Sequence, residues 1–336
     1  MTTIREVSKY ANVSVATVSR VINGSKWVSD ETRKKVLAAM KELGYQPNSF
    51  ARSLATNKSQ TIGMVVGDLS GPFFGEMMQS AERVVRSADK HLIITSSHGT
   101  AESESEAIEF LLQRRVDVLI LHLDVMSDDK LIELCDQVQV PIVMVNRLVP
   151  EIAGQCISID NDLGGYLAAR YLLDLGHRSI ACITGPLYKT DARSRLSGYR
   201  KAIEEAGVEY DESLIIESDY SEEGGKSAIK RLQRRDASYS AIFAQNDNMA
   251  IGAMALLKSE GISVPGNISI VGYDDILMAR YVEPSLTSVI VPAGEFGRQA
   301  ALLALQLSGD KHNDAVTRRF SPQLIVRESA AMATDK

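Results

Sequence analysis

Residues 13–23 read VSVATVSRVIN and follow directly on Asn12. Ser14 is a residue type that caps helices, and apolar side chains recur at helical spacing from Val18 to Ile22, so we expect a helix that begins after Ser14. Asn12 tolerates the left-handed backbone conformation that a tight turn needs. A turn of this kind between two short helices is typical of the helix-turn-helix.

The flanking sequence supplies the other two helices of such a module. Thr3 and Glu6 fit a capping box, which predicts a first helix that ends near Tyr10. A third helix is expected to begin at Ser29 and to end at Gly44. Its predicted buried side chains are Val36, Met40 and Leu43.

The second helix of a helix-turn-helix presents its first residues to base edges in the major groove. Val15 and Ala16 are expected to be exposed there, where small apolar groups contact thymine methyl groups, and Arg20 is expected to contact a guanine or a phosphate. The predicted DNA-binding residues of the module are Thr3, Ser14, Val15, Ala16, Thr17, Ser19, Arg20 and Asn23. The alternative is a small helical bundle with a polar surface.

The charge distribution favours a nucleic-acid partner. Residues 1–60 contain ten Lys/Arg and four Asp/Glu, a net charge of +6. Residues 61–336 contain 27 Lys/Arg and 39 Asp/Glu, a net charge of −12. A small basic module on an acidic body indicates that one end of the chain binds a polyanion, which the body repels.

The composition excludes several classes of protein. The chain has 336 residues, 45% hydrophobic and 24% charged, values that suit a soluble protein of two or three domains. Its apolar runs fall short of the roughly 20 residues of a membrane span, and its start lacks a signal-peptide pattern, so we expect a cytoplasmic protein without a membrane partner. Three scattered cysteines and five scattered histidines predict neither disulfides nor a metal site.

From residue 61 onward, apolar runs of five to seven residues alternate with helical stretches, which indicates parallel sheets covered by helices on both faces. The predicted strands are residues 61–67, 92–96, 118–123, 141–146, 157–160, 180–185, 214–218, 241–245, 268–272 and 286–292. The predicted helices include residues 73–89, 104–114, 164–175, 195–206, 224–234, 248–260 and 296–307. About 270 residues exceed one doubly wound lobe, so the α/β body should have two lobes.

Ligands of open parallel sheets bind beyond the carboxyl ends of the strands. The residues there are short polar side chains, an arginine and aromatic rings, a combination that suits a sugar. The predicted effector-binding residues are Asp68, Ser70, Phe73, Phe74, Asn146, Arg195, Tyr220, Asn246, Asp247 and Asp274. Structural roles are the alternatives: Asp247 and Asp274 as caps or turn residues, Phe73 and Phe74 as core, and Arg195 as a surface partner of Glu204 or Glu205.

The motifs of enzymes are missing from the sequence. Gly224-Gly225-Lys226-Ser227 resembles the end of a phosphate-binding loop, but Tyr220 stands where the first glycine is required. Neither GxSxG nor HExxH occurs. We therefore expect a binding protein rather than an enzyme. A sugar-transport protein is a weaker alternative, because it explains the body but not the basic module.

Residues 13–23, Val28-Ser29 and residues 44–48 (GYQPN) together resemble the LacI/GalR family of transcriptional repressors, and most closely its galactose-repressor branch. The resemblance covers nearly the whole chain. It implies a periplasmic-binding-protein-like body, a pseudo-palindromic operator, and D-galactose or a related hexose or galactoside as effector, with no other cofactor. Relatives that respond to a purine, a β-glucoside or a phosphoprotein are the alternatives.

The resemblance also implies the domain boundaries. These are a DNA-binding domain at 1–46, a hinge helix and linker at 47–60, an N-terminal lobe at 61–160 with 293–320, and a C-terminal lobe at 161–292 with 321–330. In the hinge, Asn48, Ala51 and Leu54 are expected to contact DNA, with Leu54 as a wedge in the minor groove. The alternative for this segment is an ordinary linker.

A homodimer is the expected assembly. The resemblance implies contacts through the helices at 73–89 and 104–115. Met77, Met78, Leu111 and Leu112 are candidates for these contacts, although some of them must belong to the core. The tail after residue 327 lacks the leucine heptads of a tetramerising helix.

Overall fold

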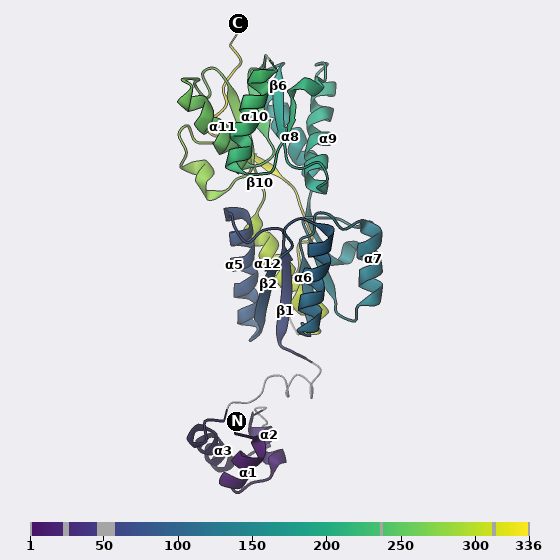
Figure 1. Cartoon of the computed structure of the whole chain (residues 1–336), viewed down its shortest axis with the longest axis vertical. Helices are drawn as coiled ribbons and strands as arrows, with labels where there is room; N and C mark the ends of the chain where they lie inside the picture. Colours follow the sequence, from purple (N-terminus) through teal and green to yellow (C-terminus); the bar gives the residue numbers. More distant parts are fainter. Residues whose placement is uncertain (1, 23–26, 46–57, 236–237, 311–313, 335–336) are drawn as a thin grey trace. The chain divides into compact units, whose positions relative to one another are not determined.

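The computed structural model describes residues 2–22, 27–45, 58–235, 238–310 and 314–334, and the chain folds into two compact units, Met1–Gln60 and Thr61–Lys336 (Figure 1). Asn23, Asn48, Ala51 and Leu54 lie outside the described residues, so their predicted DNA contacts stay predictions.

The described residues of the first unit form three helices, α1 (Ile4–Tyr10), α2 (Val15–Ile22) and α3 (Asp30–Glu42). Thr3 and Glu6 form the predicted capping box around the start of α1. The backbone N–H of Thr17 donates to Ser14 Oγ at 3.1 Å, and Asn12 has a φ of 50° in the turn before α2. Local capping and one left-handed residue therefore set the helix boundaries, as predicted.

A small core joins these helices. It consists of Val7, Val18, Val21, Val36 and Ala39, all at most 5% exposed. Met40 and Leu43, which were expected to be buried, are half-buried at the margin of this cluster.

The second unit alternates strands and helices. Its strands are β1 (Thr61–Val66), β2 (His91–Ser96), β3 (Val118–Leu121), β4 (Ile142–Val145), β5 (Cys156–Ile159), β6 (Ile180–Thr184), β7 (Ile215–Glu217), β8 (Ala241–Ala244), β9 (Ser269–Asp274), β10 (Thr287–Ile290), β11 (Arg319–Phe320) and β12 (Gln323–Ile325). Its α-helices are α5 (Pro72–Ser87), α6 (Ala101–Gln113), α7 (Asp128–Gln137), α8 (Asn161–Asp174), α9 (Thr190–Glu205), α10 (Glu222–Arg234), α11 (Asp247–Ser259) and α12 (Ala293–Leu307). Three 3-10 helices are η1 (Pro150–Gln155), η2 (Glu212–Leu214) and η3 (Leu277–Arg280).

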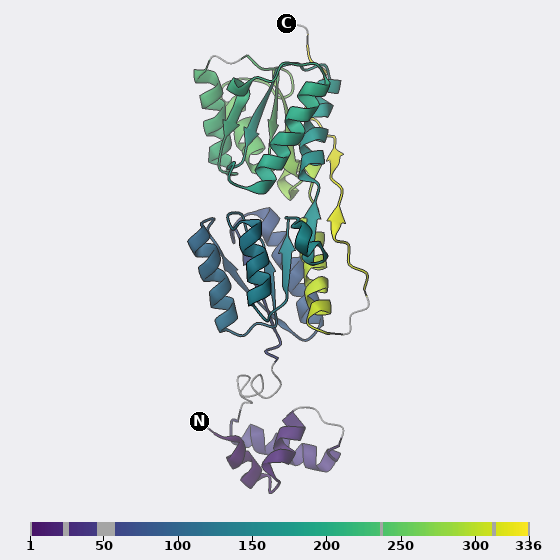
Figure 2. The ribbon, with the colours of Figure 1, turned by 90° about the vertical axis from the view of Figure 1, so that its right-hand side faces the viewer.

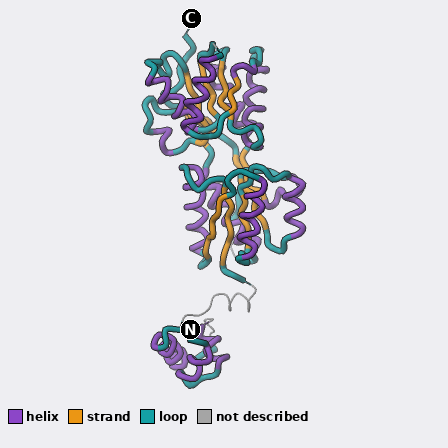
Figure 3. The backbone as a smooth tube through the Cα atoms, viewed as in Figure 1, coloured by secondary structure: helices purple, strands orange, loops and turns teal. Residues whose placement is uncertain are grey.

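Two six-stranded sheets organise this unit, and each is flanked by helices (Figures 2 and 3). The first has the order β11-β5-β4-β3-β1-β2 and the second the order β12-β10-β9-β8-β6-β7. We call the two parts built on these sheets the first lobe and the second lobe. The pairing is parallel except between β10 and β12. The fold is therefore the predicted doubly wound α/β body with two lobes.

The chain crosses between the lobes several times. After β10, helix α12 packs against α5 and the first sheet, and the closing strands β11 and β12 then join the first and the second sheet respectively (Figure 2). These two short strands and helix α7 were not among the predicted elements, because two or three residues are too few to show a period and α7 buries only Leu131.

Two of the candidate dimer contacts belong to the core instead. Met77 and Leu111 are fully buried within the first lobe, so these two are the candidates that belong to the core. Met78 and Leu112 are half-buried. In the described part of the chain, no helix is both long and apolar enough to cross a membrane.

Candidate functional site

A cavity of about 580 Å³ opens where strands of both sheets end. Of the residues predicted to bind an effector, those that line it are Asp68, Ser70, Phe73, Phe74, Asn146, Arg195, Tyr220, Asn246 and Asp274. They come from strand ends far apart in sequence, and the two-lobed fold brings them together.

Arg195 is the most extensively bound side chain at the cavity. It is 4% exposed, its Nε donates to Asn161 Oδ1 at 2.9 Å, and an Nη donates to the Gln245 carbonyl at 2.6 Å. The other Nη pairs with Asp191 Oδ2 at 3.3 Å. Arg195 is thus a buried, fixed cation at the cavity wall, and the alternative pairing with Glu204 or Glu205 on the helix surface is excluded.

Tyr220 stands beside this cation on a strained backbone. Its φ is 68°, and its ring packs over Gly185 so closely that a Cβ atom there would overlap the ring. The Tyr220 hydroxyl is buried and has no hydrogen-bond partner among the described residues. A ligand hydroxyl in the cavity could supply that partner.

Asp274 is the last residue of β9 and has a φ of 104°, a conformation that is rare outside glycine. Burial raises the pKa of its carboxyl to about 7, Arg195 lowers it, and Asp191 raises it. The carboxyl is therefore poised to accept or donate a hydrogen bond near neutral pH.

Asn246 both lines the cavity and caps a helix. Its Oδ1 accepts from the N–H of Met249 at 2.9 Å, and its Nδ2 donates to the Tyr220 carbonyl at 2.8 Å. The residue that caps α11 is therefore Asn246 and not Asp247, for which capping was considered. The bond to the Tyr220 carbonyl also joins the start of α11 to the loop that carries Tyr220.

Asp247 does not line the cavity, so the prediction that it contacts an effector is wrong. It is fully buried, and its oxygens accept from the Ser288 hydroxyl at 2.6 Å and from the N–H of Ile276 at 2.8 Å. Burial and the nearby Asp274 raise the pKa of Asp247 well above its ordinary value. Asp247 supports the turn after Asp274 by accepting from Ile276, and it does not itself line the cavity.

The first lobe contributes an aromatic wall. Phe73 and Phe74 meet edge to face at 5.3 Å, and Phe74 meets His122 in the same way at 5.1 Å. Both phenylalanines line the cavity and also pack on the core. The prediction of a cavity position and the alternative of a core position are therefore both correct. Next to them, Asp68 Oδ1 accepts from the Ser70 N–H at 2.8 Å, which lowers the pKa of Asp68.

Asn146, the predicted cavity residue after β4, is joined to the second lobe by hydrogen bonds through Asn161. It has a φ of 61°, and its Oδ1 accepts from Asn161 Nδ2 at 3.4 Å. Asn161 Oδ1 accepts from Arg195 and, at 3.0 Å, from the Tyr273 hydroxyl. One buried amide therefore links the first-lobe side chain Asn146 to the Arg195 of the second lobe.

The first unit presents the expected face of α2. Val15, Ala16 and Arg20 are exposed, whereas Thr17 and Ser19 are half-buried. Ser14 is exposed and engages Thr17, and Thr3 is exposed while its side chain takes part in the capping box. The geometry is that of a helix whose first turn is free to enter a groove.

Comparisons with known proteins agree with this organisation. Residues 3–48 match the model for bacterial regulatory proteins of the lacI family, and residues 169–330 match a periplasmic binding protein-like domain. The chain is 40% identical over 331 residues to the HTH-type transcriptional regulator GalR of Escherichia coli K12, covering 98% of this chain and 96% of that protein. The chain belongs to the LacI family.

Two further comparisons define this LacI-family protein more closely. The Ribose operon repressor of Haemophilus influenzae is 36% identical over 98% of both chains. The crystal structure of the lac repressor dimer bound to operator and the anti-inducer ONPF superposes with a TM-score of 0.86 at 29% identity, over 98% of this chain and 99% of that chain. This LacI-family protein is a DNA-binding transcriptional repressor and not an enzyme.

Several cavity residues of this LacI-family repressor were missed from the sequence. They are His98, His122, Asp124, Tyr188, Lys189 and Asp219. His122 and Asp124 follow β3, which ends at Leu121, two residues before its predicted end. Had the polar His122 been taken as the end of the apolar run, the residues after it would have been inspected as strand-end positions.

Proposed function

We propose that this repressor binds a pseudo-palindromic operator as a homodimer and that a small sugar, D-galactose or a closely related hexose or galactoside, controls its operator affinity. The observation that carries the proposal is the convergence of Asp274, Arg195 and Tyr220 in one cavity between the lobes. Asp274 offers a carboxyl, Arg195 a fixed cation, and Tyr220 a buried hydroxyl that has no hydrogen-bond partner among the described residues.

The cavity chemistry supports an uncharged polyhydroxyl ligand. Carboxylates and amides bridge neighbouring hydroxyl groups, and the rings of Phe73, Phe74 and Tyr220 offer apolar faces to sugar C–H groups. The acidic lining residues are Asp68, Asp124, Asp191, Asp219, Glu222 and Asp274, against the cations Lys189 and Arg195. This excess of carboxylates disfavours phosphorylated sugars.

D-Galactose is the favoured hexose because GalR is similar over the full length of the chain. The Ribose operon repressor is nearly as similar, so family membership alone does not name the sugar. A purine, a β-glucoside and a phosphoprotein corepressor are the other outcomes that a ligand screen must separate.

For the operator, we propose that α2 enters the major groove and that Ser14, Val15, Ala16, Thr17, Ser19 and Arg20 make its contacts, with Thr3 at the start of α1. Two such helices in a dimer would read half-sites about 34–36 Å apart, one turn of DNA. Asn23 and the hinge residues Asn48, Ala51 and Leu54 complete the proposed DNA contacts.

The dimer surface proposed here includes the second lobe. Leu277, Met278 and Tyr281 in and after η3 are 62%, 51% and 73% exposed, and a cluster of large exposed apolar side chains marks a contact surface.

Sugar binding would change how the lobes pair across the dimer, and operator affinity would fall with it. The expected coupling free energy is about 1–3 kcal/mol.

The test is a calorimetric titration of the purified full chain with D-galactose, D-glucose, D-ribose, a β-glucoside and hypoxanthine. Binding of D-galactose in the micromolar to millimolar range, and weaker binding of its epimer D-glucose, supports the proposal. Binding of hypoxanthine or D-ribose alone would overturn the galactose assignment while leaving the repressor fold intact.

A further inference from the structure

Asp124 and Lys189 form an ion pair that joins the two lobes. Lys189 Nζ lies 2.8 Å from Asp124 Oδ2, and the side chains are only 18% and 8% exposed. Asp124 follows β3 in the first lobe, Lys189 directly precedes α9 in the second, and both line the cavity. By contrast, the buried ion pairs of Lys90 and of Arg327 lie within a single lobe.

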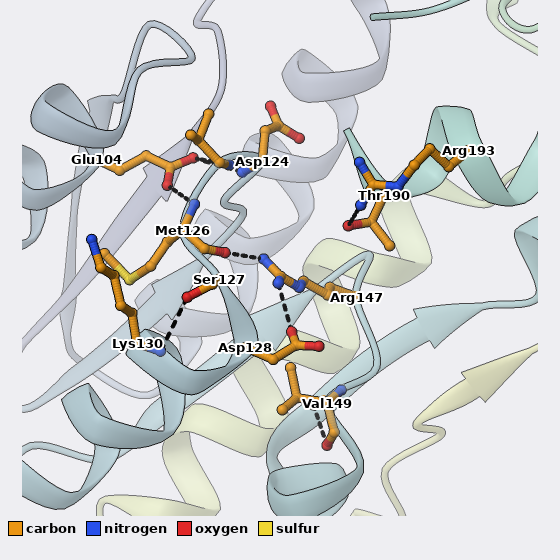
Figure 4. A network of polar contacts seen from close by, with 12 residues as sticks. Glu104, Asp124, Met126, Ser127, Asp128, Lys130, Arg147, Val149, Thr190 and Arg193 are labelled. Atoms are coloured by element: carbon orange, nitrogen blue, oxygen red, sulfur yellow. Dashed lines mark hydrogen bonds and ion pairs between the residues drawn. The ribbon is translucent and has the colours of Figure 1, made fainter. Parts of the chain in front are cut away.

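In the first lobe, hydrogen bonds fix the backbone of the loop that carries Asp124. The fully buried Glu104 accepts from three consecutive backbone N–H groups, those of Asp124, Val125 and Met126, at 2.6, 2.9 and 2.7 Å (Figure 4). Arg147 donates to the Met126 carbonyl at 2.6 Å and also pairs with Asp128. The backbone that carries Asp124 is therefore fixed at the cavity wall.

The second-lobe side is fixed in a matching way. One Nη of Arg193 donates to the carbonyls of Leu187 and Tyr188 at 2.8 and 2.6 Å. The other donates to Thr190 Oγ1 at 3.2 Å (Figure 4). The N–H of Leu187 donates to Glu217 Oε1 at 2.8 Å. These bonds fix the chain on both sides of Lys189, and the low exposure of the two side chains distinguishes this ion pair from one at the surface.

Both partners are charged at neutral pH. Burial raises the pKa of Asp124, but the facing His122 and Lys189 outweigh burial and lower it. Burial lowers the pKa of Lys189, but the Asp124 carboxylate outweighs this and raises it. A rigidly presented, partly buried ion pair contributes more than an exposed one, whose flexible partners are screened by water.

We propose that the Asp124–Lys189 ion pair is a latch that holds the two cavity walls at their closed spacing and thereby sets the affinity for the effector. A ligand that contacts both lobes binds more tightly when the closed arrangement is already populated. The latch is a determinant of effector affinity that is separate from Asp274 and Arg195. It rests on the proposed function only in that the ligand is taken to be D-galactose.

The test is a double-mutant cycle that compares the single variants Asp124→Asn and Lys189→Met with the variant that carries both substitutions. A charge-swapped variant, Asp124→Lys with Lys189→Asp, tests for rescue. Each single variant should weaken D-galactose binding about three- to tenfold, the double variant should add little further loss, and the swap should recover part of it. Glu223→Gln on the surface of α10, which breaks the exposed Lys226–Glu223 pair, is the matched control and should leave affinity unchanged.

A second readout needs no ligand. Spin labels at Glu109→Cys on α6 and Lys230→Cys on α10, in a Cys135→Ser background, report the distance between the lobes, and Asp124→Asn should shift it to longer values. Unchanged distances together with unchanged galactose affinity would overturn the latch. If the unmodified protein ignores D-galactose, the galactose proposal fails, and the distances alone then confirm or refute the latch.

Discussion

The ring of Tyr220 occupies the space that a side chain on Gly185 would fill. Gly185 directly follows β6, and its N–H donates to Gln245 Oε1 at 3.1 Å, so the backbone there cannot easily move aside. The Tyr220 hydroxyl, which lacks a partner among the described residues, thus depends on a glycine far away in the sequence for its position.

Gly185→Ala is therefore expected to displace the Tyr220 ring. Effector affinity should fall at least tenfold, and the free energy of unfolding should fall by about 1–3 kcal/mol because of overpacking. Calorimetry and denaturant unfolding measure the two effects. Gly75→Ala on α5, where a Cβ meets nothing within 4 Å, is the control, and an equal loss of affinity there would contradict the explanation.

Asp274 should make stability depend on pH. Its pKa of about 7 in the folded chain exceeds the ordinary value of 3.8, so the folded state holds the proton more tightly than the unfolded state does. Between these two values the unfolded chain binds fewer protons, and stability contributed by this group falls as the pH rises from about 4 to about 7.

Asp274→Asn removes that dependence. Relative to the variant, the unmodified protein should lose on the order of a few kcal/mol of stability between pH 4.5 and pH 7.5. Urea unfolding of both proteins at several pH values gives the comparison. A difference that does not change with pH would mean that the Asp274 carboxyl titrates normally.

Arg20→Ala should weaken operator binding and leave effector affinity unchanged. If Arg20 contacts a phosphate, affinity should fall alike for all sequences and the salt slope should drop by about one; if it reads a guanine, the loss should be about 1–3 kcal/mol and confined to one base position. Electrophoretic mobility shifts at several salt concentrations separate these cases. Lys201→Ala, on an exposed site of α9, should have no effect.

Tyr281→Asp tests the proposed dimer surface. A charge within the exposed cluster of Leu277, Met278 and Tyr281 would remain unpaired in a dimer contact, so the variant should sediment as a monomer at concentrations where the unmodified protein is dimeric. Met332→Asp is the control, because Met332 is a similarly exposed apolar residue. A dimeric Tyr281→Asp variant would place the interface elsewhere.

Local signals explain which parts of the fold could be predicted. The Thr3–Glu6 capping box, the Ser29 cap and the left-handed Asn12 act within a few residues, and each set a helix boundary as expected. The long apolar strands were equally visible. By contrast, β11 holds only two residues, and it exists because the chain returns from β10 to the first sheet, a tertiary effect that has no local pattern.

The cavity shows the same division. Asp274 and Arg195 could be inferred because they follow or lie near strand ends, where ligands of parallel sheets bind. Asp247 was misassigned because its sequence position is indistinguishable from that of its neighbour Asn246, and only the packing turns it toward Ser288. Lys189 was missed since its contact with Asp124 depends on how the lobes meet.

The most direct test of the central claim is operator binding of the unmodified protein and of Asp274→Ala, each with and without D-galactose, with Asp174→Ala on the surface of α8 as control. The sugar should weaken operator binding of the unmodified protein and of the control by about 5- to 150-fold. Asp274→Ala should bind operator with the same affinity in both conditions. An Asp274→Ala variant that still releases operator on addition of the sugar would contradict the assignment of the effector to this cavity.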